Sequence, residues 1–287
     1  MSSTRHLARR KRLSAIFAAL CALATASCVA LLVGLLGAIL YMGLGSLNWN
    51  FLTHIESRKP ELAGIAAGLV GSLWLIALTG VIAVPVGVAA AVYLEEYAPN
   101  TRWRRWVQLN IANLAGVPSI VYGILGLGLF VRWMAMGKSV MAGALTMSLV
   151  VLPIVILAAQ EALRSVPSTL RQASYALGAT RWQTVWHQVL PAALPGIMTG
   201  VILAISRALG EAAPLVAVGA ALFVQVPRTP GEEFTALPLL VYSWSDRPQP
   251  EYHALAAAAI VVLLAVLILM NAGAVYVRYR SGKKIKW

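Results

Sequence analysis

The chain has 287 residues, of which 60% are hydrophobic and 11% are charged, whereas a soluble domain carries about 25% charged residues. This composition excludes an ordinary soluble domain and predicts an integral membrane protein. Lys and Arg together number 23 against 10 Asp and Glu, an excess found both in nucleic acid binding proteins and in the cytoplasmic loops of membrane proteins.

Six apolar windows follow one another along the chain, and each is long enough for a helix to cross the hydrocarbon core, which takes about 20 residues. They cover residues 13–44, 63–94, 107–131, 139–160, 190–224 and 253–277. Helices are expected, because unpaired backbone groups are not tolerated in lipid. The first window is too long for a cleaved signal peptide and is predicted to remain as a membrane helix. We therefore predict an all-α integral membrane protein with six transmembrane helices.

The basic residues are divided unevenly between the two sides that six spans define. Sixteen Lys and Arg fall in the two tails and in the loops after the second and fourth windows, and six fall in the loops of the other side. Basic loops are retained in the cytoplasm. Both termini and the loop 161–191 are therefore predicted to be cytoplasmic. The same bias explains the basic composition without nucleic acid as a partner.

The third window contains residues that bend a helix. Gly116 and Pro118 interrupt helical hydrogen bonding, and Ser119 can bond to the backbone groups that are freed. Bent helices of small residues suit a gated pathway, in which Ser119 and Tyr122 would line the route. Small residues also favour close packing between membrane helices, and for Gly116 and Gly123 this alternative stays open.

The segment 165–191, between the fourth and fifth windows, has the pattern of two short amphipathic helices. The first helix has small and apolar residues at helical spacing, namely Leu170, Ala173, Ser174 and Leu177. Gly178 supplies a helix stop, and Thr180 with Gln183 fits a capping box for the second helix. The predicted apolar stripe of the second helix, which ends at Pro191, consists of Trp182, Val185, Trp186 and Val189. Such a hairpin either docks a soluble partner or lies on the lipid surface.

Two charged residues, Arg207 and Glu211, lie inside the fifth window, and no other window contains a charge. An arginine at a helix centre costs about 2.5–3.5 kcal/mol on insertion scales, so both charges need a reason to be there. Their i, i+4 spacing places them on one helix face. They form either a structural ion pair, or a site where Arg207 attracts a crossing oxyanion and Glu211 keeps the binding weak.

The hairpin resembles the EAA loop of ABC importer permeases, the element that couples to the ATP-binding subunit. Its small residue, its glycine and its Leu-Pro pair keep the spacing of that motif, at Ala173, Gly178, Leu190 and Pro191. The chain departs from the motif at Gln172, Ser174 and Gln188. The resemblance implies that the coupling residues are Gln172, Ala173, Ser174, Gly178, Ala179, Thr180, Trp182, Leu190 and Pro191.

Further stretches are similar to the membrane subunits of phosphate-specific ABC importers, and the Gly-Glu-Ala-Ala-Pro end of one is similar to their A-type subunit. These stretches are residues 93–99, 116–123, 207–214 and 236–244. The resemblance implies the MetI-like fold of type I ABC importer permeases. Residues 1–62 would form the N-terminal tail, the first transmembrane helix and the first outer loop. Residues 63–282 would form the permease core.

The resemblance also implies a function, namely a permease subunit that moves inorganic phosphate into the cytoplasm by alternating access in the bacterial inner membrane. The implied partners are a second, C-type permease, a homodimeric ATP-binding subunit that carries ATP and Mg, and an extracytoplasmic phosphate-binding protein. No cofactor, metal or catalytic residue is expected on this chain, because it contains no phosphate-binding loop and no metal-ligand cluster.

Two other classes of transport protein remain open. A permease for molybdate or sulfate would share every feature except the substrate. A secondary transporter or channel would need no ATP-binding subunit and often shows internal repeats, which are not apparent in this sequence.

Overall fold

The computed structural model describes residues 2–282, and the side chains of residues 10, 11 and 13–280. Within this part, five long helices are apolar enough to cross a membrane, and a bent pair of shorter helices brings the number to six if the pair is one span. The predicted all-α membrane fold is confirmed. The long helices are α1 (Ser2–Gly43), α3 (Ala66–Val92), α6 (Val140–Arg164), α9 (Leu190–Leu209) and α12 (Pro250–Gly282). Outside the described residues lie Lys283, Lys284 and Lys286 and the side chains of Arg5, Arg9 and Arg12.

The centre of the bundle is α6, which packs against both α3 and α9. Small residues allow these helices to approach closely. A Cβ added at Gly87 of α3 would lie 2.7 Å from a methyl of Val155, and one at Gly200 of α9 would lie 2.3 Å from Cβ of Ala158. The buried core of this three-helix contact includes Leu75, Ala83, Val151, Val155 and Ala204.

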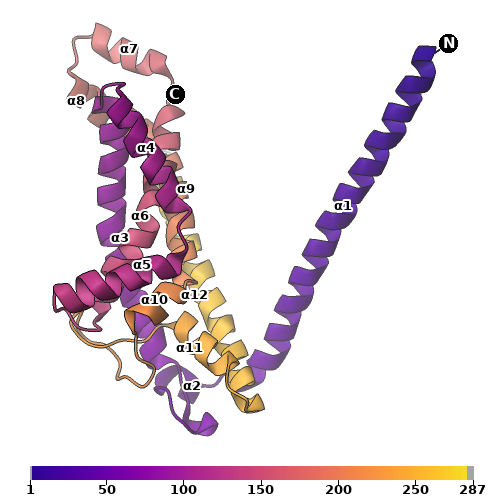
Figure 1. Cartoon of the computed structure of the whole chain (residues 1–287), viewed down its shortest axis with the longest axis vertical. Helices are drawn as coiled ribbons and strands as arrows, with labels where there is room; N and C mark the ends of the chain where they lie inside the picture. The colour runs from indigo at the N-terminus through magenta and orange to yellow at the C-terminus, as the bar shows by residue number, and fades with distance from the viewer. Residues whose placement is uncertain (1, 283–287) are drawn as a thin grey trace.

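The first helix is set apart from the bundle (Figure 1). It packs against α12 near its own C-terminal end, where a Cβ added at Gly43 would lie 2.7 Å from the backbone of Ala257. The most apolar stretch of α1 is 0% buried within the chain. In a membrane, a surface of this kind contacts lipid or another membrane protein.

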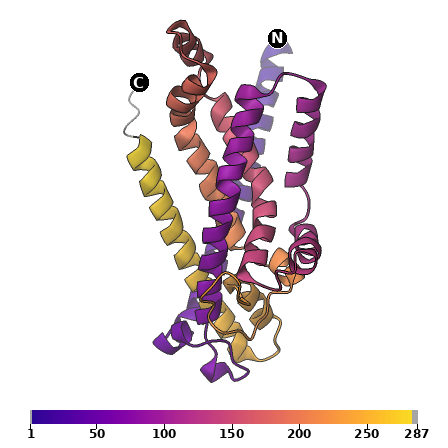
Figure 2. The same ribbon diagram turned by 90° about the vertical axis from the view of Figure 1, so that its left-hand side faces the viewer.

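Figures 1 and 2 show that the start of α1, the end of α12 and the hairpin helices α7 (Ser168–Ala176) and α8 (Arg181–Thr184) lie at one end of the molecule. The short helices α2 (Trp49–Thr53) and α11 (Leu237–Ser245) lie at the other end. The hairpin and both ends of the described chain therefore share a side, as the charge distribution requires.

The third predicted span is broken into two helices. Helix α4 (Arg102–Ala115) and helix α5 (Ser119–Gly126), which continues through a π-turn to Trp133, meet at an angle of 99°. The break falls at residues 116–118, as Gly116 and Pro118 predict, because the residue before a proline avoids the helical conformation. Helix α5 therefore lies across the direction of the other helices (Figure 1).

The fifth predicted span, residues 190–224, is too long. The helix α9 ends at Leu209, and after a short break α10 (Ala213–Val218) ends in turn at Gly219, whose φ is +87°. Irregular backbone follows up to Leu237. Its apolar residues extended the predicted window, although they form no helix; Val224 is buried, whereas Phe223 is 53% exposed.

A buried ion pair lies at the end of the molecule opposite the hairpin. Glu56 has a side chain that is 1% exposed, and one of its oxygens accepts a hydrogen bond of 2.5 Å from Arg247. The guanidinium of Arg247 also lies 4.2 Å from the ring centroid of Tyr252. Burial raises the pKa of the Glu56 carboxyl, and the charge of Arg247 opposes this rise. The pair fastens the loop after α2 to the segment between α11 and α12.

Replacing Arg247 by glutamine is expected to lower the free energy of unfolding by about 3–5 kcal/mol, because it leaves a buried carboxylate without a cation. Because the charge of Arg247 lowers the pKa of Glu56, its removal raises this pKa further, and the folded variant binds the Glu56 proton more tightly than the folded wild type does. The deficit is therefore largest at neutral pH and shrinks as the pH falls towards the ordinary carboxyl value of 4.5. Denaturant titration in detergent measures both effects.

The matched control is Lys59→Gln, which removes an exposed cation from the same loop as Glu56. This change is expected to stay within about 0.5 kcal/mol of the wild type. Equal stability of the Arg247 variant and the Lys59 variant would contradict the structural role of the ion pair.

Candidate functional site

The turn of the hairpin has the local structure that its sequence predicts. Helix α7 ends at Ala176, and Gly178 follows with φ +81°, a left-handed conformation that favours glycine. The capping box is present, because the Thr180 hydroxyl accepts a hydrogen bond from the Gln183 amide at 3.3 Å. In return, the Gln183 side chain accepts one from the Thr180 amide at 2.8 Å. Both helices of the hairpin are therefore fixed by their own caps.

The hairpin presents large apolar side chains to its surroundings. The side chains of Trp182 and Trp186 are 61% and 54% exposed, and their rings stack with centroids 5.6 Å apart. Leu177, next to the turn, is 89% exposed. Gln172 and Ala173 are exposed on α7 as well. Because exposed apolar clusters mark interaction sites, this face is a candidate docking surface.

Other predicted coupling residues hold the two hairpin helices together. The half-buried Ser174 hydroxyl lies 2.9 Å from that of Thr184, and the Ala179 amide donates to the Ser174 carbonyl at 3.2 Å. Leu190 and Pro191 are partly buried and connect the hairpin to α9. The residues predicted to couple to the ATP-binding subunit thus lie in three places. Some are on the exposed face, some form contacts inside the hairpin, and some connect it to the bundle.

The predicted apolar stripe of the second hairpin helix is wrong. Trp182 and Trp186 point outward, whereas Val185 and Val189 are buried in the bundle. The reason is a π-turn at Val185–Val189, whose wider winding departs from the assumed period of 3.6 residues. The π-turn also continues α8 into α9, so Pro191 lies inside one unbroken helical segment and does not end it.

Three of the four predicted pathway residues come together where α5, α9 and the loop after α9 meet. Nε of Arg207 donates to Glu211 at 3.2 Å, and the hydroxyl of Ser119 donates to the other carboxylate oxygen at 3.0 Å. The predicted pairing of Arg207 with Glu211 is confirmed, although Glu211 lies just beyond the helix end and not inside a helix. Arg207 is 60% exposed and Glu211 is 19% exposed, so the positive group is the accessible one.

The fourth predicted residue, Tyr122, is buried and stabilises the break between α4 and α5. Its hydroxyl donates to the Leu114 carbonyl at 2.8 Å, and this carbonyl belongs to the last turn of α4. A Cβ at the neighbouring Gly123 would lie 2.6 Å from the Pro214 carbonyl oxygen, so Gly123 serves close packing against α10.

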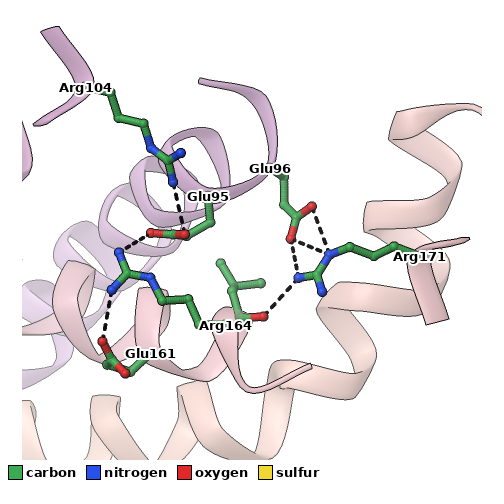
Figure 3. A network of polar contacts seen from close by, with 7 residues as sticks. Glu95, Glu96, Arg104, Glu161, Arg164 and Arg171 are labelled. Carbon is green, nitrogen blue, oxygen red and sulfur yellow. Dashed lines mark hydrogen bonds and ion pairs between the residues drawn. The ribbon is translucent and has the colours of Figure 1, made fainter. Parts of the chain in front are cut away.

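One polar network was not predicted from the sequence. Helix α3 ends in the π-turn Tyr93–Tyr97, which carries two adjacent carboxylates (Figure 3). Glu95 forms ion pairs with Arg104 at 3.2 Å and with Arg164 at 2.7 Å, and Glu96 pairs with Arg171 of α7 at 2.6 Å. The only hint of this network in the sequence is the pair of adjacent glutamates near basic loops. The arginines that pair with them lie up to 75 residues away along the chain.

No group of three metal-ligating side chains occurs among the residues that the structure describes. The candidate functional groups among these residues are the exposed hairpin face, the Arg207 cluster and the carboxylate network at the end of α3.

Known proteins resemble this chain over most of its length. Residues 83–281 match the family described as binding-protein-dependent transport system inner membrane component. The Bacillus subtilis (strain 168) protein named "Probable ABC transporter permease protein YqgI" is 32% identical over 92% of this chain and 94% of its own length. The phosphate transport system permease protein PstA 1 of Mycobacterium tuberculosis (strain CDC 1551 / Oshkosh) is 35% identical over 81% of this chain and 77% of its own length.

The fold is also similar to a solved structure. A chain of the MetNI methionine ABC transporter, in an inward-facing conformation, has a TM-score of 0.65 and 19% identity over 76% of this chain and 95% of its own. This likeness shows the MetI-like fold that the resemblance implies. Together with the relatives, it shows a multi-pass translocation subunit rather than an enzyme. The chain belongs to the family of binding-protein-dependent transport system inner membrane components, the permeases of ABC transporters.

Proposed function

We propose that this chain is a permease subunit through which an ATP-driven importer moves inorganic phosphate into the bacterial cytoplasm. Relatives named for phosphate transport support the substrate, since PstA 1 of Mycobacterium tuberculosis is a phosphate transport system permease protein. The observation on this chain that carries the proposal is the exposed Arg207. It pairs with Glu211, which also bonds to Ser119 next to the bend between α4 and α5.

The Arg207 cluster has the chemistry that a passing oxyanion needs. A guanidinium offers a planar fork of donors that suits phosphate oxygens. Glu211 engages Nε of Arg207, and Ser119 bonds to the same carboxylate, so the arginine is positioned and partly neutralised. Weak attraction favours transport, because an anion that binds too tightly cannot leave.

The partners follow from the exposed surfaces. The ATP-binding subunits, which hold ATP and Mg, receive the hairpin through its Trp182 and Trp186 face. A second permease of the related C type completes the pathway and covers part of the apolar surface of α1. An extracytoplasmic phosphate-binding protein delivers phosphate at the end that carries α2 and α11.

The orientation follows from the charge distribution, with the hairpin and both termini in the cytoplasm and the chain in the bacterial inner membrane. Residues 1–62 form the tail, the first membrane helix and the first outer loop, and residues 63–282 form the permease core with its coupling hairpin at 165–191. Nucleotide binding shifts a two-state equilibrium between inward-facing and outward-facing arrangements, because closure of the ATP-binding subunits moves the docked hairpins.

Purification of the tagged chain from its own membrane tests the proposal. We expect a second permease and an ATP-binding subunit to co-purify with it. We also expect membrane vesicles that contain the complex to accumulate phosphate only when ATP is supplied. Phosphate uptake should resist an excess of sulfate or molybdate. Uptake that needs no ATP and no ATP-binding subunit would instead identify a secondary transporter. Competition by sulfate or molybdate would identify another oxyanion as the substrate.

A further inference from the structure

The π-turn Tyr93–Tyr97 joins the coupling hairpin to the helices that cross the membrane (Figure 3). The Glu96 side chain is 6% exposed, and its carboxylate receives Nε and Nη2 of Arg171 at distances down to 2.6 Å. This is a two-pronged contact, whose geometry is more specific than that of a single ion pair. Because it is buried, it is little screened by salt.

The same guanidinium also bonds to the end of α6. Nη1 of Arg171 donates to the Val166 carbonyl at 2.8 Å, and Nη2 donates to the Leu163 carbonyl at 3.0 Å. Leu163 lies in the last turn of α6 and Val166 lies just beyond its end, a place where backbone acceptors lack helical partners. One side chain of α7 thus attaches the hairpin to both α3 and α6, the two helices that pack together along the core.

The second hairpin helix contacts the same turn. Arg181, at the start of α8, lies over the ring of Tyr97, with 5.6 Å between the guanidinium carbon and the ring centroid. Both halves of the hairpin are therefore attached to residues 93–97. A displacement of the hairpin reaches the end of α3 through two independent contacts.

From this turn α3 runs to the opposite end of the molecule. There the Ser72 hydroxyl accepts a hydrogen bond from the Leu237 amide at 2.9 Å, at the start of α11. A Cβ added at Gly71 would lie 2.0 Å from the carbonyl oxygen of Thr235, so no side chain separates the two backbones. Packed helices of this kind transmit strain, because dense interiors are not easily compressed.

We propose that Glu96 and Arg171 are positioning residues that convert displacement of the hairpin into movement of α3 and α6, and so couple ATP hydrolysis to transport. This inference rests on the proposed function, in which ATP-binding subunits move the hairpin. Glu95 differs, because its two partners, Arg104 and Arg164, lie on α4 and α6 and not on the hairpin. Glu95 stabilises the bundle, whereas Glu96 joins the bundle to the hairpin.

The test uses the assembled importer in proteoliposomes, with inorganic phosphate as substrate, and measures the phosphate imported per ATP hydrolysed. The double variant Glu96→Gln/Arg171→Gln removes both charges, so no buried charge is left unpaired. We expect it to retain the ATP-binding subunit and ATP hydrolysis, and to import about tenfold less phosphate per ATP, since allosteric couplings are typically of this size. A purely structural contact would lower both activities together and leave the ratio unchanged.

Glu95→Gln is the matched control, because it removes the neighbouring carboxylate without detaching the hairpin. We expect a normal ratio of phosphate to ATP, even where less complex is recovered. An unchanged ratio in the double variant would overturn the role of Glu96 and Arg171 and leave the proposed function intact. Wild-type complex that hydrolyses ATP without importing phosphate would overturn the proposed function, and this inference with it.

Discussion

Replacement of Arg207 by glutamine is expected to lower phosphate uptake at least about a hundredfold, the loss typical when an anion-stabilising donor is removed. Glutamine retains a hydrogen-bonding amide but lacks the positive charge that compensates an oxyanion for its lost water. The measurement is uptake of radiolabelled phosphate by whole cells, divided by the amount of chain in the membrane. Insertion and assembly should be unchanged, because Arg207 is mostly exposed and pairs with Glu211 four residues away.

Two companion variants separate the transport role from a structural one. Arg207→Lys keeps the charge but loses the planar fork, so uptake between the wild type and the glutamine variant is expected. If the pair only positions α9, the double variant Arg207→Gln/Glu211→Gln should recover uptake, because no unpaired carboxylate remains. Normal uptake by a correctly inserted Arg207→Gln chain would remove Arg207 from the pathway.

The double replacement Trp182→Ala/Trp186→Ala is expected to weaken attachment of the ATP-binding subunit at least about a hundredfold, because buried tryptophans each contribute about 2 kcal/mol or more at interfaces. The fold should persist, since both rings are exposed within this chain and the buried Val185 and Val189 are untouched. Titration of detergent-purified chain with the ATP-binding subunit measures the affinity.

The chain supplies a matched control for this experiment. Trp103 and Trp106, at the start of α4, form another exposed and stacked pair, with ring centroids 4.9 Å apart. Their replacement by alanine removes the same kind of surface, and the ATP-binding subunit should stay attached. If the two double variants bind it equally well, then the hairpin tryptophans lie on lipid, which is the alternative that the sequence left open.

Local chemistry made parts of this structure predictable. The left-handed Gly178, the capping box at Thr180 and the break at Pro118 each depend on residues close in sequence, and each is found as predicted. The i, i+4 spacing likewise predicted that Arg207 lies beside Glu211, although Glu211 follows the end of α9 and is not inside the helix. Such features need no knowledge of the rest of the chain.

The remaining features depend on contacts or windings that hydropathy does not encode. A window average treats the irregular start of the loop after α10 as membrane helix, because both are apolar. The π-turn at Val185–Val189 changes the helical period. The four residues predicted to form one apolar stripe therefore lie on two faces, with the tryptophans exposed and the valines buried. The partners of Glu96 could not be assigned, since Arg171 lies 75 residues away on another helix.

The 99° bend after α4 has an electrostatic consequence for the Arg207 cluster. It directs the amino end of α5 towards Glu211, where Ser119, the first residue of that helix, donates its hydroxyl to the carboxylate. The amino end of a helix carries about half a positive charge from its aligned peptide dipoles. Glu211 is thus held by backbone polarity as well as by a guanidinium, so compensation of its negative charge does not depend on Arg207 alone.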